Sequence, residues 1–382
     1  MNILFLADPY SIHNIKWMSF IAKEHRVFLL IRKYHLPSMT ESWILELTNK
    51  YHIHFLGAID DYSSIRFWKN SAEIKKIKTY IHKYQIQIFH ILFAEPNALW
   101  ATGKNQLKLP IVITTRGTDI LKTIPSFLSK NTVWGKWIYS LYARSFKNAS
   151  WITCTSIPQM NSVKKLIGQS DIPLQLIRTG VNIDLLSQKY LSFLPEMLKD
   201  KKFIFFPRAM QPIYQHEIAI EAIQGINTDL KKDLYFVFVD SQSKNKAYLE
   251  KISALAAALE DKLIWLPHLS PETLYACFQS CDLVVMTPAS DGTPVSAIEA
   301  MYFEKPLILP PLGLDADLFE IGPLYTRDGS AQAFTELISE FLQNKIQPET
   351  KIAKENVVAL ADQKIEMGKI LQIYNKISLA NP

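Results

Sequence analysis

Two carboxylates eight residues apart, Asp291 and Glu299, frame the part of this chain best suited to chemistry. Gly292, between them, lets the backbone approach a ligand closely, Thr293 can cap a helix, and Pro294 suits the helix's first turn. A helix starting there points free N–H groups and the positive end of its dipole outward, which suits a phosphate. The two carboxylates would then hold hydroxyls at different depths along one ligand. The alternative is that Asp291 and Thr293 are only turn and cap residues.

A second candidate is Arg208, which follows the apolar run 203–206. Ligands of α/β proteins bind at strand ends, and the planar guanidinium suits a diphosphate because it offers two parallel charge-assisted bonds. The alternative is an ordinary surface arginine in a loop.

Two further clusters lie in the first half of the chain. Arg116 and Asp119 follow the run 111–115 and could bind an acceptor or a leaving phosphate, or form a loop salt bridge. The loop 8–17 lacks the Gly-x-Gly-x-x-Gly element of dinucleotide sites. Its His13, and His90 at the end of the run 87–90, are candidates for a ligand site, although a lone histidine is more often structural.

Short apolar runs alternate with helix-length segments, which predicts parallel, doubly wound sheets. Seven expected strands precede residue 185 and five follow it, listed in chain order as 3–7, 26–31, 52–56, 87–92, 111–115, 151–155, 174–178, 203–206, 235–239, 263–266, 283–286 and 307–309. At 382 residues the chain exceeds a single core, so we expect two Rossmann-like domains facing across a cleft. The expected segments are 1–185, 186–358 and a C-terminal helix in 359–382 that packs back toward the first domain.

The composition is that of a cytoplasmic globular protein. Cys154, Cys277 and Cys281 are too few for a disulfide framework and are expected to be core residues rather than metal ligands. No signal peptide and no spanning segment are expected.

Charge divides unevenly along the chain. Residues 1–185 hold 23 Lys and Arg against 11 Asp and Glu, a net +12, whereas the whole chain carries +6. Basic residues alternate with apolar ones in 69–84 and with aromatic ones in 133–144. Both segments fit a peripheral contact with the anionic inner face of the cytoplasmic membrane, or core-facing helices with solvated basic rims. No nucleic-acid partner is expected.

Taken together, these motifs resemble the retaining glycosyltransferases of the GT-B fold, family four (glycosyl transferases group 1). The stretch 291–299 is similar to that family's E-x7-E signature, and Gly117-Thr-Asp119, Ser156, Arg178-Thr-Gly-Val-Asn182 and Arg208 follow its order over nearly the whole chain.

The resemblance implies a donor site in the second domain, with Arg208 on the diphosphate, Glu299 on the ribose and Asp291 with Gly292 on the transferred sugar. It implies an acceptor site on the first domain. The donor-binding candidates are Arg208, Gln211, Tyr214, Leu266, Pro267, His268, Asp291, Gly292, Thr293, Pro294, Val295 and Glu299. The acceptor-binding candidates are Ser11, His13, His90, Arg116 and Asp119. Catalytic roles are expected for Asp291, Glu299, Arg208, Arg116 and Asp119, with no metal and no cofactor beyond a UDP- or GDP-sugar co-substrate.

Departures from the family pattern keep alternatives open. Asp291 is shorter than the usual Glu, Tyr214-Gln215 stands where a lysine is usual, and Arg116 stands where His is common. The expected function is transfer of a sugar to a surface-glycan or lipid-linked acceptor. A nucleotide-sugar epimerase or hydrolase of the same fold, or a catalytically silent sugar-nucleotide-binding protein, remains an alternative.

Overall fold

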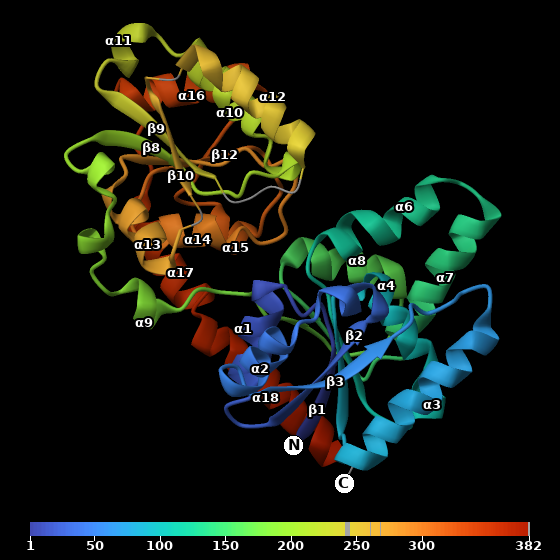
Figure 1. Cartoon of the computed structure of the whole chain (residues 1–382). Coiled ribbons are helices and arrows are strands. Elements are labelled where there is room, and N and C mark those ends of the chain that lie inside the picture. The colour runs from blue at the N-terminus through green and yellow to red at the C-terminus, as the bar shows by residue number, and fades with distance from the viewer. Residues whose placement is uncertain (241–244, 260, 268, 381–382) are drawn as a thin grey trace. The chain divides into compact units, whose positions relative to one another are not determined.

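A computed structural model describes residues 1–240, 245–259, 261–267 and 269–380 (Figure 1). The chain forms two compact units, one of Met1–Thr179 with the C-terminal segment from Lys364, the other of Gly180–Gln363. The first boundary lies a few residues before the expected 185, because the short helix α9 (Ile183–Leu186) already belongs to the second unit.

The N-terminal unit contains a seven-stranded parallel sheet in the order β3-β2-β1-β4-β5-β6-β7. Each expected strand of this half is present, and the observed bounds are β1 Asn2–Leu6, β2 Arg26–Arg32, β3 Ile53–Ile59, β4 Ile88–Leu92, β5 Ile111–Thr114, β6 Trp151–Cys154 and β7 Leu174–Leu176. The strand order reverses between β1 and β4, so this is the switch point at which ligands of such sheets bind.

Helices cover both faces of this sheet, as its nearly all-apolar strands require. Apolar side chains of α3 (Phe67–Tyr84), α7 (Val133–Lys147) and α8 (Ile157–Ile167) pack on one face. Those of α1 (Ile12–Ile21), α2 (Glu41–Asn49) and α18 (Gln363–Ala380) pack on the other.

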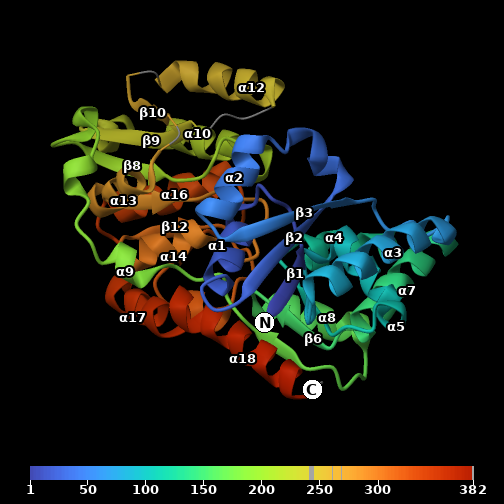
Figure 2. The ribbon, with the colours of Figure 1, turned by 60° about the horizontal axis from the view of Figure 1, so that its bottom comes forward.

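The C-terminal helix α18 is an integral part of the N-terminal unit. Figure 2, like Figure 1, shows it passing the start of β1. Its Tyr374 hydroxyl lies 2.5 Å from His90 Nδ1, and its buried Glu366 accepts the backbone N–H of Arg178 at 2.8 Å. The expected C-terminal helix therefore does more than lie on the surface, because it supplies Met367, Ile370 and Tyr374 to the core.

The second unit contains a six-stranded parallel sheet in the order β10-β9-β8-β11-β12-β13. Its strands are β8 Lys202–Phe206, β9 Leu234–Asp240, β10 Leu263–Pro267, β11 Leu283–Val285, β12 Leu307–Leu309 and β13 Leu324–Tyr325. The two-residue β13 was not expected, since so short a strand leaves no periodicity in the sequence. The switch point of this sheet lies between β8 and β11.

Two helical layers cover this second sheet. Apolar side chains of α13 (Pro271–Ser280), α14 (Val295–Tyr302) and α17 (Thr350–Leu360) form one core. Those of α10 (His216–Gly225), α12 (Lys246–Ala256) and α16 (Ala331–Leu342) form the other. Both units are therefore doubly wound Rossmann-like α/β folds, as expected. Among the described residues, no helix is both long and apolar enough to cross a bilayer.

Candidate functional site

The loops after β8 and β11 form one continuous edge at the switch point of the second sheet. Thr287 Oγ1 donates to the carbonyl oxygens of Tyr214 and Gln215, at 2.8 and 3.1 Å, and the Ala289 N–H donates to Ile213 at 2.9 Å. These bonds bring the segment containing Arg208 next to the segment containing Asp291.

Arg208 is the centre of this edge. Its Nη2 lies 2.8 Å from Asp291 Oδ2, its Nη1 lies 3.5 Å from Ser296 Oγ, and its guanidinium carbon lies 4.0 Å from the ring centroid of Tyr214. The Arg208 and Asp291 side chains are only 16% and 14% exposed. Within the described residues, the buried Nε of Arg208 has no hydrogen-bond acceptor.

The pKa of the Asp291 carboxyl group is subject to opposing effects. Burial raises its pKa, while the charge of Arg208 and the backbone N–H groups of Gly292 and Thr293 oppose that rise. The sequence placed Arg208 and Asp291 on different parts of a ligand, whereas the structure pairs them directly. An anionic ligand that engages Arg208 would therefore compete with the Asp291 carboxylate.

The helix start beside this pair differs by one residue from expectation. Pro294, not Thr293, occupies the N-cap position of α14, and it makes no side-chain cap bond. The N–H groups of Ala297 and Ile298 turn back to the Pro294 carbonyl, at 3.0 and 3.2 Å. The amides of Val295 and Ser296, without intrahelical acceptors, and the helix dipole suit a phosphate.

Glu299 lies inside α14 and is 6% exposed. Burial, and secondarily the charge of Glu299, raise the pKa of Tyr275 on the neighbouring helix α13. Because the helix rises about 1.5 Å per residue, Glu299 is roughly 6 Å deeper than the first amides of α14. The start of α14 and the deeper Glu299 carboxylate lie in the expected order, whereas the phosphate and the hydroxyls assigned to them stay predictions.

The remaining donor candidates lie on the same edge or outside the described residues. Gln211 is exposed where the short turn Pro212–Tyr214 begins, and Leu266 and Pro267 end β10, two strands from β8. Leu266 is buried and Pro267 exposed. His268 lies outside the described residues.

In the N-terminal unit, Arg116 contacts helix α1, which follows β1. Its guanidinium carbon lies 4.3 Å from the Trp17 ring centroid, and its Nη2 lies 3.5 Å from Asn14 Oδ1. Burial lowers the pKa of Arg116 to about 9, against the opposing effect of Asp119. Ser11 caps α1 by accepting the Asn14 N–H at 3.4 Å, and His13 is exposed at that helix start.

The structure contradicts a ligand-facing position for Asp119. Its side chain is fully buried and accepts backbone N–H groups from Ala94, Arg116, Gly117 and Ile120, at 2.7 to 3.2 Å. These bonds hold the loop after β5 in shape, so the carboxylate positions Arg116 instead of facing a ligand.

The expectation for His90 is wrong in the same way. The residue lies in the middle of β4, not at its end, and it is 0% exposed. Its Nδ1 contacts Tyr374 and its Nε2 lies 2.7 Å from Thr114 Oγ1, so both ring nitrogens have partners. Burial and the charge of Arg116 hold the pKa of His90 well below its usual range.

Three residues that were not expected at either site, Ser296, Asn14 and Trp17, contact the two arginines. Ser296 lies in the first turn of α14, next to the Arg208 guanidinium. Asn14 and Trp17 are three residues apart on α1, a spacing that places both on one helical face. That spacing was the available signal for their joint contact with Arg116.

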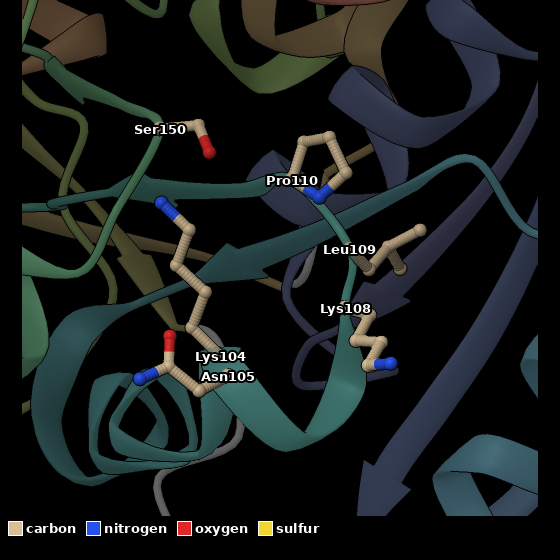
Figure 3. Close-up of a pocket in the computed structure, with 6 residues that line it drawn as sticks. All are labelled: Lys104, Asn105, Lys108, Leu109, Pro110 and Ser150. Atoms are coloured by element: carbon tan, nitrogen blue, oxygen red, sulfur yellow. The ribbon is translucent and has the colours of Figure 1, made fainter. Parts of the chain in front are cut away.

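The described part of the chain contains neither a disulfide nor a cluster of metal ligands. The three cysteines are buried and free, and burial raises the pKa of each thiol to about 12. No group of three or more His, Cys, Asp or Glu suited to a metal occurs among these residues. A pocket lined by Lys104, Asn105, Lys108, Leu109, Pro110 and Ser150 lies at the amino-terminal ends of β5 and β6, away from the strand ends that carry the candidates (Figure 3).

Comparison with protein families matches both halves of the chain. Residues 193–357 match the family described as Glycosyl transferases group 1, and residues 2–156 match Glycosyl transferase 4-like. A curated relative is an uncharacterized glycosyltransferase of Methanocaldococcus jannaschii, 24% identical over 335 residues that cover 85% of each chain.

Solved structures share the fold at low sequence identity. A glycosyltransferase from Rickettsia africae has a TM-score of 0.76 at 16% identity, covering 100% of this chain and 99% of its own. Anabaena HepE in complex with UDP has a TM-score of 0.75 at 17% identity, covering 99% and 100%. Both parallel-sheet domains therefore match the GT-B architecture.

Proposed function

We propose that this protein transfers a hexose from a UDP- or GDP-sugar, with retention of configuration, to a surface-glycan or lipid-linked acceptor. The proposal is supported by the match of its two halves to glycosyltransferase families and by the GT-B fold of its domains. The observation that carries the proposal is the cluster of Arg208, Asp291 and the start of α14 at the switch point of the second sheet. HepE, which shares the fold, was solved with UDP, and this supports a uridine donor.

In the proposed reaction, Arg208 and the amides of Val295 and Ser296 bind the diphosphate and stabilise the negative charge that grows on it. The bond between the anomeric carbon and the phosphate oxygen breaks. The acceptor hydroxyl attacks that carbon from the same face, and its proton passes to the departing phosphate oxygen. Glu299 holds the ribose, Asp291 contacts the sugar, and the acceptor lies at the strand ends of the N-terminal unit near Ser11, His13 and Arg116. This chain's contribution is chiefly positioning and charge stabilisation.

The function is tested by incubating the protein with a panel of UDP- and GDP-sugars and measuring nucleotide release with and without membrane extract. Release that requires extract is expected. Release without extract would indicate a hydrolase, and binding without release would indicate a silent nucleotide-sugar-binding protein. Nucleotide release that continues after a chelator has removed divalent metal ions would agree with charge stabilisation by Arg208 and the helix amides.

The donor site is tested separately with Glu299→Ala. Loss of a buried hydrogen bond to a charged group costs about 1.5–3 kcal/mol, so the donor should bind roughly tenfold or more weakly by calorimetry. Glu355→Ala, which removes an exposed carboxylate from α17, is the matched control and should bind normally. Glu299→Gln preserves the volume and should lie between the two. Unchanged affinity in Glu299→Ala would remove Glu299 from the site.

A further inference from the structure

An exposed aromatic surface lies where α6 (Ile124–Ser129) turns into α7. We call Leu128, Lys130, Val133, Trp134, Lys136 and Trp137 the α6–α7 tip. Val133 is 88% exposed, Trp134 49%, Leu128 41% and Trp137 38%, and the two indole rings lie 4.7 Å apart. Figure 1 shows this turn protruding from the edge of the N-terminal unit. Four large apolar side chains are therefore gathered at one protruding point.

The fold does not need these side chains, because the opposite face of α7 already packs the helix. Ile138, Tyr142 and Phe146 are buried there, and the Tyr142 ring stacks on Phe127 of α6 at 6.0 Å. Helix α7 begins tight against α6, since a Cβ on Gly135 would lie 2.1 Å from the Phe127 carbonyl oxygen. The two tryptophans thus protrude from a closely packed hairpin rather than from a loose loop.

The charge around the tip has one sign. Between Asp119 and Asp171 the chain contains no acidic residue and seven basic ones, all of them exposed: Lys122, Lys130, Lys136, Arg144, Lys147, Lys164 and Lys165. The carboxylates of Glu95 and Asp61 lie on the other side of α7, where their charges add to the effect of burial in raising the pKa of the buried Tyr142. Tyr142 is about two helical turns from Trp134. The exposed face of the hairpin therefore attracts anions.

From this combination, we propose that the α6–α7 tip docks the protein on an anionic lipid surface. Indole rings settle at the headgroup level of a bilayer, where one part is apolar and the N–H is hydrated. Lysines that flank them reach the phosphates, and their attraction to anionic lipid falls off within a Debye length. The residues of the tip are all outside the donor site, so this inference goes beyond the proposed function and can be tested without a substrate.

Helix α3 is the other basic segment, and it fits a membrane less well. Its Ile74 and Ile77 are buried in the sheet's core, and its Lys76 ammonium donates to the Ala58 carbonyl oxygen. Trp68 is exposed near its start, but Tyr80, Ile81 and Tyr84 also pack against that core. This helix has a solvated basic rim, whereas α7 leaves Trp134 and Trp137 exposed.

The test is co-sedimentation with vesicles of equal parts phosphatidylglycerol and phosphatidylcholine, and with vesicles of phosphatidylcholine alone. Wild-type protein should bind the anionic vesicles, lose binding as salt is added, and bind the neutral ones at least tenfold more weakly. K130E/K136E should reduce affinity at least about thirtyfold, since each lysine near such a surface contributes about 1 kcal/mol and each glutamate adds repulsion. W134A/W137A should reduce it at least tenfold. Tyr34→Ala, which removes another exposed aromatic ring of the same unit, is the control and should bind like wild type.

Wild-type affinity in both double variants, or equal binding to neutral and anionic vesicles, would overturn the proposal. So would a dimer in solution that W134A/W137A converts to a monomer, because the tip would then be a protein interface. UDP binding of each variant, measured alongside, reports that the variant is folded. A protein that sediments with anionic vesicles but binds no nucleotide would support the tip and count only against the proposed function.

Discussion

At the scale of single residues, the Arg208–Asp291 ion pair is the feature that the sequence did not reveal. The two residues are 83 apart and each was assigned to its own part of a ligand, but the hydrogen bonds of Thr287 bring their loops together. A guanidinium that is already paired with a buried carboxylate binds an anionic ligand more weakly than an unpaired guanidinium does. We therefore expect the pair to limit how strongly the proposed diphosphate can bind.

Asp291→Asn should expose this competition. The variant leaves Arg208 buried without a counter-ion, which destabilises the free protein. UDP should consequently bind several-fold more tightly by calorimetry and raise the melting temperature more than it does in wild type, while sugar transfer falls. Asp328→Asn, an exposed change in the same unit, should leave both unaltered. Weaker UDP binding in Asp291→Asn would mean that the carboxylate supports the diphosphate site instead of competing with it.

The incorrect expectations at this scale share one cause. Residue type and approximate strand ends suggested that Asp119 and His90 face a ligand, but orientation and burial decide otherwise. The strand β4 continues two residues beyond His90, which places the ring in the core, and four backbone N–H groups surround Asp119. A sequence cannot show where a side chain's hydrogen bonds go when its partners come from distant elements such as α18.

At the scale of elements, the sequence predicted most of the architecture because parallel strands covered on both faces are short, continuous apolar runs. It predicted α14 to within one residue, although Pro294 rather than Thr293 is its N-cap. It missed β13, which is two residues long, and it gave no indication of how the connections between the units are built.

Those connections depend on Gly180. The residue has a φ of +64°, and a Cβ there would lie 2.7 Å from the Ala361 carbonyl oxygen. Its neighbour Val181 exchanges backbone hydrogen bonds with Ala361 and Gln363, both at 2.9 Å, so the two strands of the connection are joined. The glycine is thus required both by its backbone angle and by the lack of space.

Gly180→Ala should lower the free energy of unfolding by about 1–3 kcal/mol, because strain and overpacking add. Gly368→Ala is the matched comparison, since Gly368 lies in α18 with open space around it and has an ordinary φ. Alanine favours a helix over glycine by up to about 1 kcal/mol, so this variant should be as stable as wild type or more so. Urea unfolding followed by circular dichroism compares the two. Equal effects from both substitutions would contradict a special role for Gly180.

At the scale of the whole molecule, each unit contains a buried neutral histidine, His90 in the first and His216 in the second. His216 is 2% exposed, its Nε2 lies 3.1 Å from the Arg208 carbonyl oxygen, and burial lowers its pKa to about 4. His90 has a pKa well below its usual range for the same reason, with the charge of Arg116 adding to it. Both units should therefore respond to acid, and the His216 response should reach the loop that carries Arg208.

The direction of the pH effect follows from these lowered pKa values. An unfolded histidine takes up its proton near pH 6.5, whereas folded His216 resists protonation until about pH 4. Stability is thus greatest above about pH 6.5 and falls as the pH drops toward 4, because the unfolded chain then binds more protons. For His216 alone the loss amounts to about 3 kcal/mol across that window.

Urea midpoints measured at intervals from pH 7.5 to 4.5 should fall steeply in wild type. His216→Gln should show a lower midpoint at neutral pH but a shallower decline, while His54→Gln, an exposed change on β3, should follow wild type. If His216→Gln declined as steeply as wild type, the acid response would have to arise from other groups.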